Sequence, residues 1–510
     1  MRVSREEALN ELRGTAFDVL IVGGGINGAG VARDAALRGL KVCLLEQGDF
    51  ASGTSSKSTK IAHGGLRYLR NFEIGLVRES QRERLRLRRQ LPHLVKPQSF
   101  CYPVYKDGAD PLWKVRLGVG FYTLLAGFRE RSRRLSAAET LTTNPHLRPH
   151  DLDGSVRYWD DRMDDARVCL ETVLSAEESG ATCLNYVRVH GIVPQPSGFE
   201  AGYQDIVTGA TGTVSARTVC NCAGPWSDQV RGLLGDSTRM LRPTKGVHIV
   251  VPRIESADAL ILDNPDDNRT FFAIPWDGFT LIGTTDTRYD GDPGRVQVDA
   301  ADIDYLLDAA NHYLPGARLT GASILHSFAG LRPLVAPASD DLVEGKISRR
   351  HLVRPGPPGV VTVLGGKFTT FRQMTQEATD ALVESLGFPH RTCITAGRPY
   401  FEARGSTIGF GEQPALWQSL EARYGPRAAD VYDICASTPQ LGEPVIEGQP
   451  VRMGELVFAL LEEHAVYLDD LWERRTMLSW TGRRPEEALN GRLTALTAAG
   501  LKLRDPATPA

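Results

Sequence analysis

Short apolar runs alternate with a helix-like spacing over the first fifty residues. Residues 17–22 (FDVLIV) are continuous, apolar and rich in β-branched side chains, which predicts a buried parallel strand. A helical pattern follows as far as Arg38, where Gly39 ends it, and residues 41–45 predict a second strand that closes with Glu46. This order of strand, helix and strand predicts the first unit of a doubly wound α/β domain.

The turn between the first strand and the helix is rich in glycine. It reads GGGINGAG from Gly23, a GxGxxG pattern in the position where nucleotide-binding domains need it. Gly23 permits a tight turn, Gly25 lets the backbone approach a pyrophosphate, and Gly28 lets the helix pack closely on the sheet. Glu46 stands where an acid accepts hydrogen bonds from ribose hydroxyls, which argues against a 2′-phosphate and so against NADP. The sequence therefore predicts a dinucleotide site.

A segment rich in Ser, Thr and Gly follows at residues 49–65 and carries Lys57, Lys60 and His63. Its hydroxyl and backbone groups can wrap a second phosphate and run along an isoalloxazine ring, which favours FAD over NAD. By itself, the same composition is also typical of a solvated loop.

The overall composition is that of an ordinary globular protein of two to three domains. The chain has 510 residues, a formal net charge of −3, 42% hydrophobic residues and 24% charged residues, and nothing in that balance points to nucleic acid. Residues 1–15 lack the apolar core of a signal peptide, and no stretch reaches the ~18–20 apolar residues that span a bilayer. We therefore expect a cytoplasmic protein, soluble or peripheral.

Eight cysteines are spread along the chain. Their spacing fits no zinc site, and we predict no metal site. Cys220 and Cys222 share one face of a predicted strand, so a disulfide between them is conceivable, but two reduced thiols are the favoured interpretation.

Further motifs follow in order from the glycine turn to the C-terminal region. They are SSKSTKIAHGGLRYL at 55–69, DDAR at 164–167, NCAGPW at 221–226, TKGVHIVVP at 244–252, IGTTD at 282–286, GLRPL at 330–334, GGKFTT at 365–370 and LWERRT at 471–476. With this set the chain resembles the FAD-dependent glycerol-3-phosphate dehydrogenases of the aerobic, respiratory type, within the D-amino-acid-oxidase-like superfamily. The resemblance extends from Phe17 to the end, and its order and spacing are more specific than any single motif.

The motifs and the resemblance together imply FAD, and the resemblance implies that it is held non-covalently. The residues expected to bind it are Gly23, Gly24, Gly25, Ile26, Asn27, Glu46, Gln47, Thr54, Ser55, Ser56, Thr59, His63, Gly64, Gly65, Ala223, Gly224, Trp226, Gly330, Lys367, Phe368 and Thr369.

The substrate site needs an anion pocket and a proton acceptor. A phosphate dianion favours guanidinium and ammonium groups, and the resemblance assigns this role to Arg67, Arg332 and Lys367, with Tyr68 beside them. His63 and His248 are the candidate bases, since imidazole titrates near neutrality. The residues alone do not decide between the two, and His63 has the alternative role of positioning the flavin. Predicted catalytic residues are therefore His63, His248, Arg332 and Lys367; predicted substrate-binding residues are Arg67, Tyr68, His248, Arg332 and Lys367.

The activity that the resemblance implies is oxidation of sn-glycerol 3-phosphate to dihydroxyacetone phosphate by hydride transfer to FAD, with the electrons passed to a membrane quinone. Three alternatives stay open. They are an oxidase that uses O₂ on the same substrate, an amine or amino-acid oxidase of the same superfamily, and a flavin-binding sensor or electron-transfer subunit. The sequence carries no obvious long insertion, which weakly favours the dehydrogenase. The oligomeric state, a homodimer included, is left open.

The predicted fold is α/β, with a Rossmann-type FAD-binding domain, an antiparallel-sheet substrate domain and a C-terminal helical domain. Alternating strands in residues 242–329 predict the antiparallel sheet, and amphipathic patterns at 454–464 and 467–479 predict C-terminal helices. The expected limits are an oxidoreductase region at 16–395 (FAD domain about 16–102, 161–241 and 330–395; substrate domain mainly 242–329 with 103–160) and a helical domain at 397–510.

Residues 117–128 (LGVGFYTLLAGF) are apolar, and basic residues flank them on both sides. Twelve residues are too short to span a bilayer. A buried helix of the substrate domain is the favoured interpretation, and a helix lying in the interface of an anionic leaflet is the alternative. Peripheral attachment to the inner face of the cell membrane is implied mainly by the resemblance.

Overall fold

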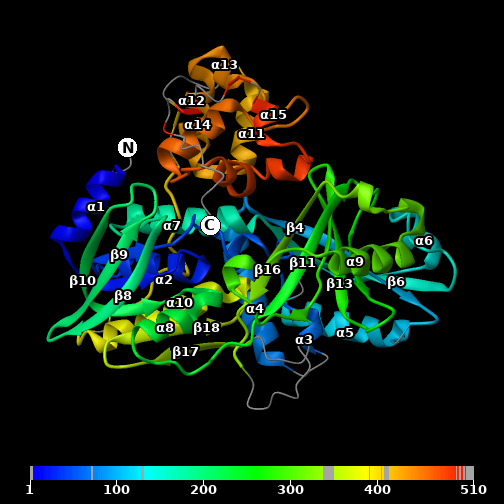
Figure 1. Ribbon diagram of the computed structural model, residues 1–510. Helices are drawn as coiled ribbons and strands as arrows, with labels where there is room; N and C mark the ends of the chain where they lie inside the picture. The colour runs from blue at the N-terminus through cyan, green and yellow to red at the C-terminus, as the bar shows by residue number, and fades with distance from the viewer. Residues whose placement is uncertain are drawn as a thin grey trace.

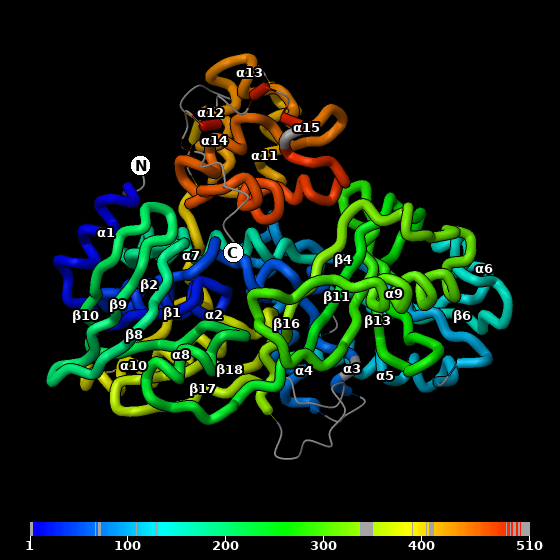
Figure 2. The backbone as a smooth tube through the Cα atoms, viewed as in Figure 1, coloured from blue at the N-terminus to red at the C-terminus, as the bar shows by residue number. Residues whose placement is uncertain are grey.

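A computed structural model describes most of the chain in three parts (Figure 1). A layered α/β unit and a second sheet lie side by side, and a group of C-terminal helices lies above them; the tube in Figure 2 shows the same arrangement. The described residues are 4–69, 73–108, 110–127, 131–336, 350–389, 391–403, 405–406, 413–489, 491–492, 496–497 and 500, without the side chains of Arg67 and Glu486.

The first sheet contains the predicted nucleotide-binding strands. Its order is β17-β18-β10-β1-β2-β7, and β10, β1, β2, β7 and β18 run parallel to their neighbours, while β17 is antiparallel to β18. A β8–β9 hairpin extends from β10. The strands are β1 (Ala16–Val22), β2 (Val42–Leu45), β7 (Thr182–Leu184), β8 (Val187–Gln195), β9 (Gly198–Asp205), β10 (Thr211–Asn221), β17 (His351–Pro355) and β18 (Val360–Gly365).

Separate apolar clusters cover the two faces of this sheet. Val19 and Ile21 of β1 point toward one cluster, which includes α2, α7 and α10, and Leu20 points toward the other, which includes α1 and the β8–β9 hairpin. Because neighbouring strand residues face opposite ways, a strand that is buried on both faces must be apolar throughout, as FDVLIV nearly is. The helices are α1 (Arg5–Gly14), α2 (Ile26–Leu37), α7 (Asp165–Glu178), α8 (Ser227–Leu233) and α10 (Phe371–Ser385).

The second sheet is largely antiparallel, as predicted, and has the order β15-β11-β14-β13-β12-β4-β6-β3, with β16 on β11 and β5 on β6. Its strands are β3 (Ile61–Ala62), β4 (Val95–Tyr105), β5 (Arg133–Leu135), β6 (Leu152–Met163), β11 (Thr244–Pro252), β12 (Ala259–Asp263), β13 (Thr270–Trp276), β14 (Phe279–Gly283), β15 (Thr287–Arg288) and β16 (His326–Arg332). The fold class is thus confirmed. The domain limits stay a prediction; β3 and most of β4 fall within the predicted FAD segment 16–102 but pair in this sheet.

Helices cover both faces of the second sheet as well. One apolar cluster joins α5 to strand residues such as Tyr158 and Ile274, and another joins α9 to strand residues such as Val247 and Ile282. The helices are α3 (Leu66–Leu69), α4 (Ile74–Gln90), α5 (Leu112–Leu125), α6 (Ala137–Thr143) and α9 (Ala300–Tyr313). Within the described ranges, no helix is long and apolar enough to cross a membrane.

The C-terminal part is helical. Its elements are α11 (Pro414–Tyr424), α12 (Ala428–Ser437), α13 (Pro439–Gly442), α14 (Met453–Glu462) and α15 (Pro485–Leu489), with a π-helical turn at Asp470–Arg475 and a 3₁₀ turn at Leu478–Thr481. The helix predicted at 454–464 corresponds to α14. The prediction of one amphipathic helix over 467–479 is wrong, because the π turn ends at Arg475, and Met477, with a left-handed φ of 53°, separates it from the 3₁₀ turn at Leu478–Thr481.

Buried ion pairs join the C-terminal part to the first sheet. Both terminal N–H groups of Arg475 donate hydrogen bonds to the Asp49 carboxylate, at 2.7 and 2.9 Å. The Nε–H group of Arg474 donates to the same carboxylate at 2.6 Å. Arg167 makes a second bidentate pair, with Glu463, at 2.6 and 2.9 Å. Burial by itself raises the pKa of Asp49, but the two guanidinium groups outweigh it and hold that pKa below its usual range. LWERRT therefore acts here as a docking motif.

Asp49→Asn leaves both arginines buried beside a neutral side chain. We expect a loss of about 3–5 kcal/mol of stability, the usual cost of removing one partner of a buried pair. Because the pKa of Asp49 is depressed, its contribution is present above about pH 4 and is lost as the pH falls further. Apparent melting temperatures against pH measure both effects. In Asp277→Asn, which loses an exposed pair with Arg162, we expect a change of at most ~1 kcal/mol; equal effects would contradict the docking role.

Candidate functional site

The glycine turn after β1 leaves no room for side chains. Gly23 has a φ of 109°, and a Cβ added there would lie 2.6 Å from the carbonyl oxygen of Cys222. A Cβ on Gly28 would lie 1.8 Å from the carbonyl oxygen of Gly23. Gly25 is the N-cap of α2, so the start of that helix presents backbone rather than a side chain. The packing therefore excludes a side chain at Gly23 and Gly28, as the motif predicts, and a Cβ on Gly25 would lie 3.0 Å from Ser55 Oγ.

Glu46 at the end of β2 is oriented by the same turn. Its carboxylate accepts hydrogen bonds from the backbone N–H of Gly24 at 2.6 Å and of Gly48 at 2.8 Å. Burial raises the pKa of Glu46, and those two hydrogen bonds lower it in part. Each carboxylate oxygen has a further lone pair, so the predicted ribose contact is chemically compatible with this orientation.

A cavity of about 510 Å³ extends from this turn to the second sheet. That volume is typical of ligand sites. Most of the predicted cofactor residues line it; Gly24, Ser56 and Gly64 are described but do not. Those that line it are Gly23, Gly25, Ile26, Asn27, Glu46, Gln47, Thr54, Ser55, Thr59, His63, Gly65, Ala223, Gly224, Trp226, Gly330, Lys367, Phe368 and Thr369.

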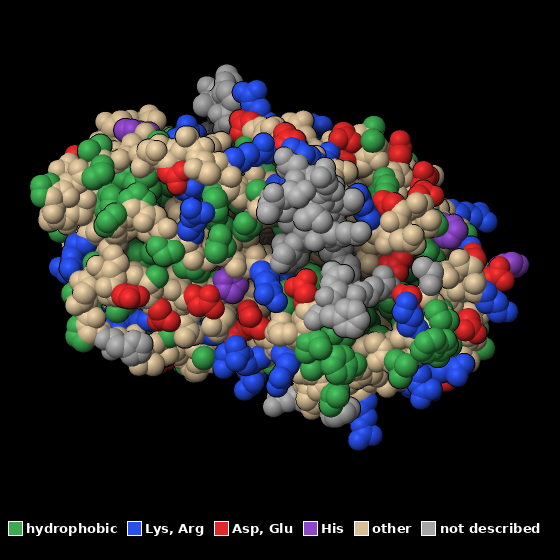
Figure 3. All heavy atoms as spheres, turned by 90° about the horizontal axis from the view of Figure 1, so that it is seen from below, with side chains coloured by type: hydrophobic (Ala, Val, Ile, Leu, Met, Phe, Trp, Pro, Cys, Tyr) green, Lys and Arg blue, Asp and Glu red, His purple; other side chains and the backbone are tan. Residues whose placement is uncertain are grey.

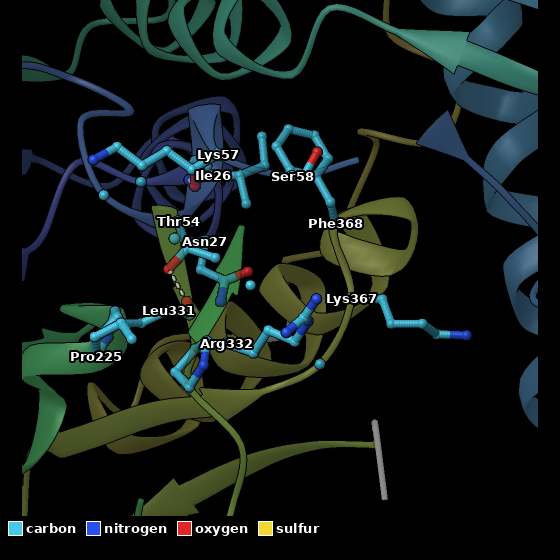
Figure 4. Close-up of a pocket in the computed structure, with 18 of the residues that line it drawn as sticks. Ile26, Asn27, Thr54, Lys57, Ser58, Pro225, Leu331, Arg332, Lys367 and Phe368 are labelled. Atoms are coloured by element: carbon cyan, nitrogen blue, oxygen red, sulfur yellow. Dashed lines mark hydrogen bonds between the residues drawn. The ribbon is translucent and has the colours of Figure 1, made fainter. Parts of the chain in front are cut away.

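The hydroxyl-rich segment after Asp49 runs along this cavity. Ser55 Oγ accepts from the backbone N–H of Ile26 at 2.9 Å, and Thr54 Oγ1 donates to the carbonyl of Leu331 at 2.6 Å, the dashed bond in Figure 4. One side of the segment is therefore fixed to α2 and the other to β16. Thr54 and Ser55 are therefore bonded to the protein on both sides and do not belong to a solvated loop, which was the alternative interpretation of this composition.

His248 lies on β11 inside the cavity. Its Nε2 is 3.0 Å from Thr59 Oγ1, and its ring stacks on Phe328 with 5.0 Å between centroids. A Cβ on Gly283, the facing residue of β14, would lie 2.3 Å from the ring, so glycine makes the space. Burial, and then the charges of Arg332 and Lys60, hold the pKa of His248 well below its ordinary value. The imidazole is therefore neutral near pH 7.

Arg332 ends β16 and faces the same cavity. Its guanidinium donates to the carboxylate of Asp286 at 3.1 Å and to Thr284 Oγ1 at 2.9 Å. A Cβ on Gly246, the β11 residue beside it, would lie 2.6 Å from the guanidinium. The strand register that pairs Gly246 with Gly330 therefore makes the space in which Arg332 lies.

Lys367 and His63 line another part of the wall. The Lys367 ammonium donates to Ser80 Oγ at 2.7 Å and lies 4.2 Å from the ring centroid of Tyr68. Figure 4 shows this side chain directed away from Arg332. The ring of His63 lies 6.4 Å from that of Tyr68, and its backbone N–H donates to Thr369 Oγ1 at 3.2 Å. The predicted Arg67 side chain lies outside the described residues.

The sequence reasoning missed several lining residues. Asp286 and Thr284 belong to the IGTTD motif, so their position next to Arg332 had a signal, whereas Arg269 and the buried carboxyl of Asp160 had none. Burial raises the pKa of Asp160 to about 7, despite its pair with Arg84.

The sulfur atoms of Cys220 and Cys222 lie 3.6 Å apart, and both residues are free thiols, which was the favoured interpretation of their spacing.

Comparison with known proteins agrees with this geometry. The model of the FAD dependent oxidoreductase family matches residues 18–372, and that of the C-terminal domain of alpha-glycerophosphate oxidase matches residues 362–505. A glycerol-3-phosphate dehydrogenase of Synechocystis is 38% identical, over 92% of this chain and 90% of its own. An aerobic glycerol-3-phosphate dehydrogenase of Staphylococcus epidermidis is 34% identical, over 93% and 89%.

Among solved structures, the glycerol-3-phosphate dehydrogenase of Bacillus halodurans complexed with FAD matches with a TM-score of 0.74 and 28% identity, over 99% of each chain. A glycine oxidase of Geobacillus kaustophilus matches with a TM-score of 0.56 and 20% identity, over 76% of this chain and 100% of its own, which supports the fold alone. The chain belongs to the FAD-dependent glycerol-3-phosphate dehydrogenase family.

FAD is the cofactor of this family member. The observed cradle fits it, since Gly23 and Gly28 accept only a backbone without Cβ and the N-terminus of α2 faces the cavity. The contact of each named residue with the cofactor stays a prediction. The positions of Ser55 and Glu46 are compatible with such contacts, because backbone N–H groups of the same turn hold both side chains in place.

Proposed function

We propose that the protein oxidises sn-glycerol 3-phosphate to dihydroxyacetone phosphate and passes the electrons to a membrane quinone. The observation that carries the proposal is the placement of Arg332 and a neutral His248 in the same cavity as the dinucleotide turn. An anion site, a proton acceptor and a redox cofactor site then share one space. The names of the relatives, which are glycerol-3-phosphate dehydrogenases, support the choice of substrate.

Arg332 is the proposed anchor for the substrate phosphate. Guanidinium donors bind phosphate oxygens in pairs, and the side chain of Arg332 is partly exposed and lines the cavity. Lys367 and Arg67 retain their proposed supporting role. The ammonium of Lys367 contacts Ser80 and Tyr68. We therefore expect Lys367 to contact the substrate from the side of Tyr68 and not from the side of Arg332.

His248 is the proposed base that accepts the proton of the C2 hydroxyl. It is buried and neutral, and the charges of Arg332 and Lys60 oppose its protonation. A phosphate dianion beside Arg332 offsets these charges, so substrate binding itself favours proton transfer to His248. FAD supplies the hydride acceptor. His63, which contacts the Tyr68 side of the wall, is assigned to positioning of the cofactor.

The surface of α5 supports peripheral membrane contact. One face of the helix packs on the second sheet through Leu112, Val115 and Val119, as the favoured interpretation requires, but the other face is exposed. Figure 3 shows hydrophobic side chains close to basic ones on the underside of the molecule, where Figure 1 places α5. The exposed apolar stripe is Trp113, Leu117, Phe121 and Leu124, and the exposed basic residues near it are Lys114, Arg116, Arg131, Arg133 and Arg134.

This combination fits an anionic leaflet, in which apolar side chains enter the interface and basic ones contact lipid headgroups. Because quinones are confined to the bilayer, attachment through α5 brings the proposed electron acceptor to the protein. The same proposal places the protein on the inner face of the cell membrane.

Anaerobic addition of sn-glycerol 3-phosphate should bleach the visible flavin absorbance of the purified protein. A quinone analogue should restore the colour much faster than air does. Restoration by air at the same rate would make the protein an oxidase. A flavin that stays oxidised with this substrate but is bleached by amino acids would reassign it to the amine and amino-acid oxidases.

His248→Gln should lower the limiting rate of flavin reduction by about 10²–10⁴, the usual contribution of a general base. The affinity for substrate should change little, since Arg332 is retained. In the unaltered protein, activity should persist as the pH falls to 6.5, because a depressed pKa keeps the imidazole unprotonated there. Stopped-flow reduction over a pH series measures both. His63→Gln is the matched comparison, and a large rate loss there with none in His248→Gln would reverse the assignment.

Trp113→Glu combined with Leu117→Glu should weaken binding to vesicles of mixed anionic and neutral phospholipid at least tenfold, given about 1.5–3 kcal/mol for each large side chain buried. Cosedimentation measures the bound fraction. Val193→Glu combined with Ile394→Glu, which changes exposed apolar residues elsewhere, should leave it unaltered. Unimpaired binding by the α5 variant would reject this surface.

A further inference from the structure

Arg269 lies at the end of the cavity formed by the second sheet, next to Arg332 and Asp286. Its Nη1 donates to the backbone carbonyl of Asp286 at 2.5 Å, and Arg332 Nη1 pairs with the carboxylate of the same residue at 3.1 Å. Two guanidinium groups, one from the end of β16 and one from the turn before β13, therefore converge on one residue at the cavity wall.

The backbone around Arg269 is fixed before any ligand binds. Arg269 immediately precedes β13, its N–H donates to the Asp267 carboxylate at 2.9 Å, and its carbonyl accepts from the N–H of Asn264 at 2.8 Å. These bonds hold the turn from β12 to β13, so the side chain starts from a defined position. A preorganised guanidinium loses less freedom when it binds an anion.

The two arginines remain accessible to a ligand. Their side chains are 31% and 24% exposed, while Asp286 is 10% exposed. Among the described contacts, the hydrogen bond of Arg269 uses Nη1, and its ion pair with Asp267 is a longer 3.5 Å from Nε. A guanidinium has five N–H donors, and Arg269 lines the cavity, so these described contacts leave donors for an anion.

We infer that Arg269 is a second phosphate-binding residue, which forms with Arg332 a two-guanidinium pocket that selects phosphorylated over unphosphorylated polyols. This rests on the proposed function for the identity of the substrate. A dianion needs more than one cation, and Arg332 already shares its charge with Asp286. Arg269 supplies the additional positive charge at the same end of the cavity.

Two probes test the inference, namely inorganic phosphate and sn-glycerol 3-phosphate. Phosphate binding to the oxidised holoenzyme is followed through the flavin spectrum, and substrate binding through anaerobic stopped-flow reduction. In Arg269→Gln, we expect both dissociation constants to rise by about 10- to 100-fold, the usual loss for a hydrogen bond to a charged group. The limiting rate of reduction should be unaltered, because His248 is retained.

Arg269→Lys should give an intermediate loss, since lysine keeps the charge but not the fork of donors. Arg253→Gln is the matched control: Arg253 is exposed, follows β11, and donates to the carbonyl of Ser256. It should bind both probes like the unaltered protein.

Unaltered binding of both probes by Arg269→Gln would overturn the inference. So would a variant that loses flavin content and reduction rate along with binding, since that pattern reports a structural role in the β12–β13 turn. If phosphate binding depends on Arg269 but the substrate does not reduce the flavin, the anion pocket stands and the proposed substrate fails.

Discussion

Residues 49–60 cross the molecule between the two sheets, and their side chains bond to all three parts of the chain. A connector with this many polar groups is costly to bury unless each group finds a partner. Here the partners come from α2 and α7, from strands of the second sheet and from the C-terminal region. The pairs are Asp49 with Arg474 and Arg475, Thr54 with Leu331, Ser55 with Ile26, Thr59 with His248, and Lys60 with Asp165.

The cofactor cradle and the candidate base are positioned by the same short segment. The docking contact at Asp49 and the contacts of Ser55 and Thr59 therefore belong to one continuous stretch of backbone. This explains in physical terms why a C-terminal motif as charged as LWERRT belongs to a flavoenzyme. Its arginines neutralise the first carboxylate of a segment that then lines the cavity.

The part of the site that sequence predicts is the part that local geometry determines. The glycine turn, the strand before it and the acid at Glu46 follow from period and spacing within thirty residues. Arg269 was not predictable, because its approach to Asp286 depends on how β13 and β14 pair. The contact of Lys367 with Ser80 depends in the same way on α4, which is far away in sequence. Likewise, the pattern of α5 shows that it is apolar but not which face a distant strand covers.

Electrostatics links the remaining features of the cavity. Burial, and then Arg474, lower the pKa of Lys57, just as burial and then Arg332 and Lys60 lower that of His248. Cations thus oppose further positive charge at these two positions of the wall, and the ligands proposed for the cavity, a pyrophosphate and a phosphate ester, are anionic. Glycine makes room for this crowding at three places: a Cβ on Gly283 would meet the ring of His248, one on Gly246 the guanidinium of Arg332, and one on Gly330 the Cβ and carbonyl of Lys57. Glycine weakens a strand, so its use at three neighbouring positions indicates that the backbone of this sheet is built around the bulk and charge of the site.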